Sequence, residues 1–236
     1  MLVTRDALFN GSVVLFQPAR GSGYRTNVDA LLLAGFAKHS RVASLAFDLG
    51  AGVGAVGLGL LRLDAARRVI LVEIDEAAAA LARRNLDANG WTDRGEVLCG
   101  DVRELSCSLR GNGNLVVCNP PYIEPGRGRV PPAQAVARSG DLGTFVAAAR
   151  QVAGRRARVC FVYPAYEVAH LLSRLAIEGL HAKRMRFVHG TADVPARVVL
   201  VEATAGRSGG VAVMPALIER GPAGYTAEME ALLSPA

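Results

Sequence analysis

The stretch VASLAFDLGAGVGAVGLGLLR occupies residues 42–62 and carries the clearest sign of how the chain folds. Residues 42–49 are mostly apolar and predict a buried strand, and the glycines of 50–54 predict a tight turn. Residues 53–62 are again mostly apolar and predict a helix. A strand that passes through a glycine turn into a helix begins a βαβ unit, so this stretch predicts an α/β fold.

The same alternation of strands and helices continues towards the C-terminus. We expect further strands over 68–74, 97–101, 115–118, 158–163, 184–188 and 197–203, and helices over 75–89, 142–153 and 166–178. With 42–49 these make seven strands of a doubly wound, mostly parallel sheet. A strand over 12–17 and a helix over 30–37, which Asp29 is placed to cap, form a short extension within residues 1–40. We expect residues 1–236 to form one domain.

Composition excludes several classes of protein. Half of the 236 residues are hydrophobic, but no apolar run reaches the ~18 residues of a membrane span, and no signal peptide is recognisable. The four cysteines lie far apart without histidines at ligand spacing, which predicts reduced thiols, a cytoplasmic location and no metal site. The net charge of +6 suits a polyanion such as RNA, although an arginine-rich composition also arises from a GC-rich coding sequence.

The glycine turn predicts a site for a ligand beyond the end of its strand. Gly50 and Gly52 let a ligand approach the main chain, and the helix that follows offers free N–H groups. Asp48 would repel a pyrophosphate, whereas it would attract the ammonium of S-adenosylmethionine. Two alternatives stay open at this point. The glycines, with Ala55, also fit the dinucleotide pattern G-x-G-x-x-G/A, and they could serve strand-to-helix packing alone.

Two further carboxylates follow predicted strands. Glu73 is placed to accept hydrogen bonds from both hydroxyls of a ribose, which S-adenosylmethionine and NAD share. Asp101 is placed to accept from the amino group of an adenine, although a helix cap or a turn explains it nearly as well. These two residues therefore predict a nucleoside ligand without deciding which one.

The sequence Asn119-Pro120-Pro121-Tyr122 predicts the chemistry. Two prolines hold a rigid, extended turn and donate no hydrogen bonds, so carbonyl oxygens stay free at the end of the strand. The side-chain oxygen of Asn119 and the main-chain oxygen of Pro120 can accept both N–H groups of a planar amino group and direct its lone pair at a methyl group. Tyr122 can stack on the planar substrate. An ordinary proline-rich turn is the alternative.

Basic residues follow this motif and predict contacts with a substrate. Arg127 and Arg129 belong to a loop over 126–132, which either covers the substrate or is a solvated connection. Together with Arg138 they are placed to contact an RNA phosphate backbone, and Pro121 to contact the base.

With these motifs the chain resembles the class I S-adenosylmethionine-dependent methyltransferases that act on amino groups. It is most similar to the bacterial tRNA(Val) adenine-N6-methyltransferase family, through Thr4–Leu8, Gln17-Pro18, Gly23–Leu33, Met214–Leu217 and Gly224–Thr226. The resemblance implies a Rossmann-like sheet, S-adenosylmethionine as cofactor and an anticodon-loop adenine as target. It also implies that Asp48, Gly50 and Gly52 hold the methionine end of the cofactor, Glu73 the ribose and Asp101 the adenine, while Asp29 lies in a segment that closes over it.

Two other functions use part of the same pattern. Protein-glutamine methyltransferases that act on release factors share Asn-Pro-Pro-Tyr, but they carry an N-terminal helical domain, and only about 40 residues precede the first core strand here. A nucleotide-binding Rossmann protein without methyltransferase activity would leave Asn-Pro-Pro-Tyr unexplained. The sequence alone gives no oligomeric state.

Overall fold

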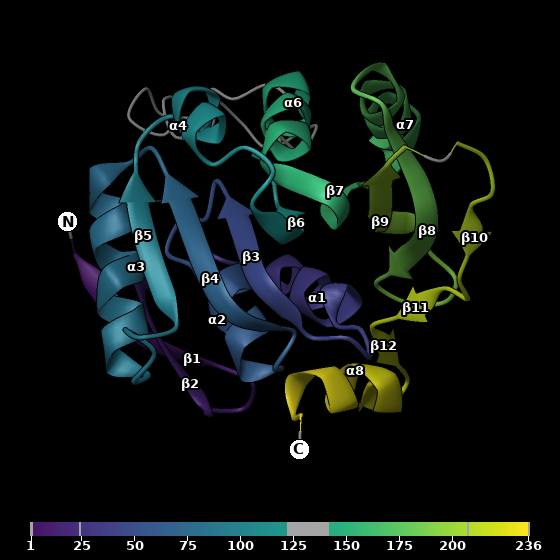
Figure 1. Ribbon diagram of the computed structural model, residues 1–236. Coiled ribbons are helices and arrows are strands. Elements are labelled where there is room, and N and C mark those ends of the chain that lie inside the picture. The colour runs from purple at the N-terminus through teal and green to yellow at the C-terminus, as the bar shows by residue number, and fades with distance from the viewer. Residues whose placement is uncertain (1, 24, 122–141, 207, 236) are drawn as a thin grey trace.

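The computed structural model describes residues 2–23, 25–121, 142–206 and 208–235. The strands of its large sheet are β3 (Ala43–Leu49), β4 (Ala66–Glu73), β5 (Gly95–Cys99), β6 (Gly113–Cys118), β7 (Ala153–Pro164), β8 (Leu180–His189), β9 (Ala196–Ala205), β10 (Ala212–Val213) and β11 (Leu217–Ile218). Their spatial order is β5-β4-β3-β6-β7-β9-β8, and both β10 and β11 pair with β8 (Figure 1).

Most neighbours in this sheet are parallel, as the sequence predicted. β3 pairs in parallel with β4 and β6, and the same holds for β4 with β5 and for β6 with β7. Among the described strands of this large sheet, only β9 is antiparallel to both of its neighbours, β7 and β8. The seven expected strands are all present. The described sheet has nine, because the two-residue strands β10 and β11, too short to leave a pattern in the sequence, add to its edge.

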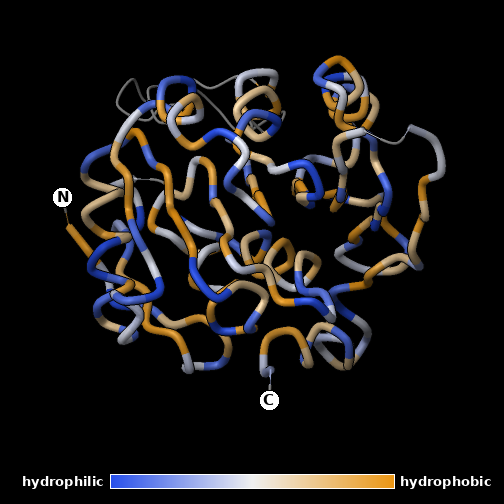
Figure 2. The backbone as a smooth tube through the Cα atoms, viewed as in Figure 1, coloured by the Kyte–Doolittle hydropathy of each residue, from blue (hydrophilic) through white to orange (hydrophobic). Residues whose placement is uncertain are grey.

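Helices cover both faces of the sheet. They are α1 (Val28–Ala37), α2 (Ala55–Arg62), α3 (Glu76–Ala88), α4 (Val102–Ser108), α6 (Leu142–Val152), α7 (Val168–Ile177), which follows a short 3-10 turn, and α8 (Ala227–Leu233). One hydrophobic cluster joins α1, α2 and α3 to the sheet, and a second joins α4, α6 and α7 to its other face (Figure 1). Figure 2 shows hydrophobic stretches along the strands between these layers.

A hairpin of β1 (Val3–Leu8) and β2 (Val13–Pro18) precedes the sheet. Phe9 and Asn10 turn the chain with positive φ angles of 50° and 47°, and Asn10-Gly11 is a typical hairpin sequence. Near the C-terminus β12 (Arg220–Gly221) and β13 (Gly224–Tyr225) form a second, two-residue hairpin. β2 and α3 pack together, so the N-terminal hairpin is attached beside the layer of α1, α2 and α3.

Other details also differ from the sequence expectations. β1, α4 and α8 were not predicted, because each is short or interrupted by charged and polar residues. The cap of α1 is Asn27, whose side chain accepts from the backbone N–H of Asp29, so Asp29 lies inside the first turn and is not the cap.

Among the described residues, none of the helices combines the length and the apolar character needed to cross a membrane.

Candidate active site

Three neighbouring strands end at the same edge of the sheet and bring most of the predicted site together. β4, β3 and β6 are adjacent and parallel, so their carboxyl ends lie side by side. Asp48 and the glycine turn lie at the end of β3, Glu73 ends β4, and Asn119 directly follows β6. In open α/β sheets this edge is where ligands bind. The structure therefore gathers residues that are up to 71 positions apart in the sequence.

The glycine turn leaves open space beside its backbone. Gly50 and Gly52 have φ angles of 72° and 56°, which favour glycine. The N–H groups of Gly50 and Ala51 donate to the carbonyl oxygen of Val72, at 2.9 and 3.0 Å, and tie the turn to β4. A Cβ added at Gly52 would meet nothing within 4 Å, whereas one at Gly50 would lie 2.8 Å from the ring of Phe145. Gly50 is thus required by packing and Gly52 faces the open side.

Asp48 is buried and holds the start of α2 against the end of β3. Its Oδ2 accepts from the backbone N–H of Gly57 at 3.0 Å. Burial, together with the nearby charge of Glu73, raises the pKa of Asp48 to about 7, against the lowering effect of the Gly57 bond. A positive charge bound next to Asp48 would favour its ionised form again. The expected contact with the ammonium of the cofactor stays a prediction.

Glu73 joins the glycine turn to the start of the next helix. One carboxylate oxygen accepts from the N–H of Gly52 at 2.7 Å, and the other accepts from the N–H of Asp75 at 2.9 Å. Asp75 caps α3 through Ala78, as the sequence predicted. Burial raises the pKa of Glu73, although these backbone bonds oppose the rise. Each carboxylate oxygen keeps a lone pair, so two ribose hydroxyls can still donate to it.

Asp101 caps α4, which is the second of the two readings that the sequence allowed. Its side chain accepts from the backbone N–H of Arg103 at 2.8 Å and forms an ion pair with the Arg103 guanidinium. The hydrogen bond from that side chain holds the pKa of Asp101 below its usual range. Asp101 lies just past the end of β5, the neighbour of β4. Its contact with an adenine remains a prediction.

The side-chain oxygen of Asn119 has no hydrogen-bond partner among the described residues, although it is buried. A buried oxygen without a partner costs about 1–3 kcal/mol, so it needs an explanation. An amino group that donates to it from the open edge would supply one. Pro120 is buried and Pro121 half-buried. Tyr122, Arg127, Arg129 and Arg138, also predicted for the site, lie outside the described residues.

Asp29 is fully buried in α1 and forms an ion pair with Arg197 at the start of β9. The same guanidinium makes two hydrogen bonds to Glu219, which follows β11. Burial opposes the charge of Arg197, but its bonds to Glu219 and Asp29 outweigh burial and raise its pKa. Since β9 is antiparallel, its start lies at the same edge as the end of β6. The N-terminal extension is thereby fixed near the site, while a contact of Asp29 with the cofactor stays a prediction.

Asn85 on α3 links the N-terminal hairpin to the glycine turn, and sequence reasoning missed it. Its amide accepts from the N–H of Phe16 at 2.6 Å and donates to the Phe16 oxygen at 3.0 Å. It also donates to the oxygen of Val53, at 2.9 Å. One turn later Asn89 forms the same pair of bonds with Val14. Asn85 lies inside α3 although asparagine is a poor helix former, and that was the available signal; Asn89 is the C-cap of the same helix.

Comparisons with known proteins identify the family of the chain. Residues 26–138 match the family model of the methyltransferase small domain. A tRNA1(Val) (adenine(37)-N6)-methyltransferase of Cronobacter sakazakii is 32% identical over 182 residues, which are 75% of this chain and 74% of that protein. Its counterpart in Serratia proteamaculans is 30% identical over 76% of this chain and 70% of its own length. The chain belongs to the family of these tRNA1(Val) (adenine(37)-N6)-methyltransferases.

Membership makes the chain an S-adenosylmethionine-dependent methyltransferase, and its residues fit that cofactor. Glu73 stands beside a glycine turn with open space in front of it, which is what a nucleoside with an amino-acid tail requires. A crystal structure named a predicted O-methyltransferase, from Agrobacterium tumefaciens, covers 86% of this chain and 94% of its own, with a TM-score of 0.70 and 24% identity. The structure of M. jannaschii TYW2 in complex with AdoMet matches 85% of this chain and 84% of its own chain. Its TM-score is 0.58 and its sequence identity 14%. These two support the Rossmann-like fold.

Proposed function

We propose that this enzyme transfers a methyl group from S-adenosylmethionine to the N6 amino group of an adenine in the anticodon loop of a tRNA. The observation that carries the proposal is the buried, unpartnered oxygen of Asn119 at the carboxyl end of β6. Among the described residues no donor reaches this oxygen. The exocyclic amino group of an adenine that has left its stack and its base pair is a donor in need of an acceptor, so the two groups complement each other. The names of the family members supply the adenine and the tRNA.

The chain's own residues would act by position. S-adenosylmethionine, when bound, supplies an electrophilic methyl group on a positively charged sulfur. Asn119 accepts one N–H of the adenine amino group and the oxygen of Pro120 accepts the other, which turns the nitrogen lone pair towards the methyl group. Methyl transfer to that nitrogen would leave S-adenosylhomocysteine behind, and the proton released by the nitrogen would pass to solvent water. Positioning and fixed dipoles of this kind need no general base.

The shape of the site requires an unpaired base. A pocket at the end of a sheet cannot reach an amino group inside a helix, so the adenine has to leave its stack first. Loop nucleotides do this at the lowest cost. Tyr122 would then stack on the adenine, and Arg127, Arg129 and Arg138 would contact phosphates, all four outside the described residues. A tRNA partner also fits the cytoplasmic location that the scattered cysteines predict.

One incubation experiment tests this function. The protein is mixed with S-adenosylmethionine carrying a labelled methyl group and, in separate reactions, with total tRNA, ribosomal RNA and a release factor. We expect label only in tRNA, as N6-methyladenosine in the digested nucleosides. Label on a glutamine of the release factor with none in RNA would favour the protein-glutamine alternative and refute the proposal.

A further inference from the structure

A surface furrow runs along α6 on the face of the sheet covered by α4, α6 and α7. It consists of two adjoining hollows that share Gln151. The first, of about 340 Å³, is lined by Arg103, Ser106, Gly143, Thr144, Ala147, Ala148, Gln151, Arg174 and Glu178. The second, of about 560 Å³, is lined by Arg110, Gly111, Arg150, Gln151, Ala153, Arg155, Ala205 and Gly206.

The furrow leads from the edge that holds the candidate active site to the opposite edge of the sheet. It begins at Gly143, in the first turn of α6, and reaches Gln151, in its last turn. At ~1.5 Å per helical residue these two positions are about 12 Å apart. The second hollow then lies between Gly111 and Ala153, where β6 and β7 begin. The furrow therefore spans most of the height of the sheet.

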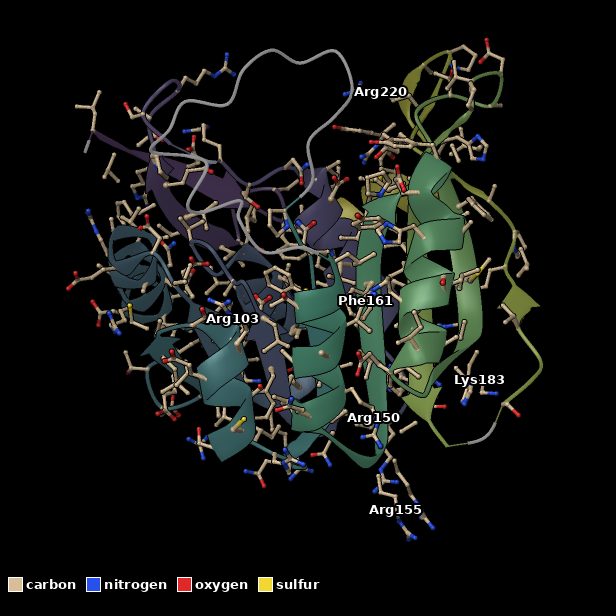
Figure 3. All side chains as sticks on the ribbon, turned by 90° about the horizontal axis from the view of Figure 1, so that it is seen from above. Arg103, Arg150, Arg155, Phe161, Lys183 and Arg220 are labelled. Carbon is tan, nitrogen blue, oxygen red and sulfur yellow. The ribbon has the colours of Figure 1, made fainter. Side chains whose placement is uncertain are left out.

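The far half of the furrow is positively charged without counter-charges. Arg110, Arg150 and Arg155 form no ion pair with any residue in the part of the chain that the structure describes. Within that same part of the chain, no carboxylate lines the second hollow. Figure 3 shows Arg150 and Arg155 at the same end of the molecule. Arginines that share a hollow repel one another, so an anion bound there would relieve the repulsion.

The first hollow is mixed in charge. Arg174 lines it together with Glu178, and the guanidinium of Arg103 is occupied by Asp101. Among the described residues the charged side chains of the second hollow are all arginines, at the edge opposite the active site. A partner that contacts both the active site and the second hollow has to carry negative charge some 12 Å or more away from that site. A mononucleotide is too short, whereas an RNA strand carries a phosphate on every nucleotide.

We propose that this furrow binds the phosphate backbone of the base-paired stem that carries the target loop. The inference rests on the proposed function, because it takes the loop adenine to be at Asn119. A stem that continues from that loop can then lie along α6 and reach Arg110, Arg150 and Arg155. These arginines would contribute affinity and salt dependence without reading the sequence, as phosphate contacts do.

The test compares two triple variants of equal charge. One is Arg110→Gln/Arg150→Gln/Arg155→Gln in the furrow. The control is Arg20→Gln/Lys38→Gln/Arg41→Gln, whose side chains are exposed and lie outside both hollows. Binding of whole tRNA and of a single-stranded loop oligonucleotide is measured over a range of salt concentrations. Thermal unfolding confirms that each variant folds. If the triple furrow variant does not fold, the single variant Arg155→Gln takes its place.

We expect the furrow variant to bind whole tRNA at least tenfold more weakly at low salt than the wild type. The slope of log K against log salt should become less negative by about 2–3, roughly one for each phosphate that no longer meets an arginine. Its affinity for the loop oligonucleotide and the rate of methylation of that oligonucleotide should stay unchanged. Unchanged tRNA binding, an equal loss in the control variant or an equal loss with the oligonucleotide would overturn the inference. A wild-type protein that methylates no RNA would instead refute the proposed function itself, and with it the partner assigned to the furrow.

Discussion

Replacing Asn119 with alanine should separate stability from activity. In the described residues its buried oxygen has no partner, so the substitution removes no hydrogen bond from the fold. It removes instead a desolvated acceptor that costs about 1–3 kcal/mol, partly offset by the small cavity left behind. We therefore expect the free energy of unfolding to be unchanged or to rise by about 1 kcal/mol. That rise corresponds to roughly 2–4 °C in the melting temperature of a chain of this size.

Turnover should respond in the opposite direction. A fixed dipole that acts on the reacting group is worth about 10²–10³ in rate, or ~3–4 kcal/mol of barrier. Affinity for S-adenosylhomocysteine should stay normal, because Asn119 acts on the incoming amino group and not on the cofactor.

The assays are thermal unfolding, calorimetry with S-adenosylhomocysteine and single-turnover methyl transfer. Asn114→Ala is the matched control, since this asparagine lies on β6, which Asn119 directly follows, and its oxygen accepts from the N–H of Leu45 at 3.2 Å. The control should lose about 0.5–1.5 kcal/mol of stability and keep its turnover. An Asn119→Ala protein that loses stability and retains near-normal turnover would show that the side chain is only structural.

Three further substitutions test the rest of the site. Glu73→Ala should weaken S-adenosylhomocysteine binding by about 1.5–3 kcal/mol, and unchanged affinity in calorimetry would remove Glu73 from the site. Asp48→Asn should stabilise the protein at pH 8 by up to ~4 kcal/mol, because burial raises the folded-state pKa of Asp48 to about 7. The folded state then favours the protonated acid, so the stability of the wild type falls as pH rises from about 4 to 7. In denaturant titrations the stabilisation by Asp48→Asn should therefore vanish below that pH range. A stabilisation that does not depend on pH would contradict this. Asn85→Ala should cost about 3 kcal/mol and increase amide exchange in residues 13–18, since the oxygens of Phe16 and Val53 lose their donor; exchange confined to α3 would count against the link.

The sequence predicted the elements whose burial is regular and missed those that depend on partners far along the chain. Strands such as 43–49 and 113–118 are apolar runs between parallel neighbours, and such runs are legible in a single sequence. β1 carries Arg5 and Asp6 and was not recognised. Its Asp6 accepts from Gln17 and pairs with Arg25, so the charge that argued against a strand serves to hold the hairpin.

The residues of the candidate site also fall into those that the sequence could predict and those that it could not. Asp48, Glu73 and Asn119 were predictable because the ends of parallel strands meet at one edge, whatever the loops between them do. Arg197 could not be found, since its importance arises only when β9 returns antiparallel beside α1 and places its guanidinium between Asp29 and Glu219. Asn27, two positions before Asp29, is the cap because its side-chain oxygen accepts from the backbone N–H of Asp29, which places Asp29 inside the first turn.

Asn85 on α3 and Asn89 directly after it have a consequence for the order in which the protein folds during synthesis. Residues 3–18 leave the ribosome well before α3, and a two-stranded hairpin is at best marginally stable in water. Until Asn85 and Asn89 arrive, the N–H and carbonyl groups of Val14 and Phe16 form an open strand edge to which another chain could pair. The nascent chain is therefore most vulnerable to aggregation over the roughly 70 residues of synthesis that separate β2 from the end of α3, and the two amides close that edge once the helix forms.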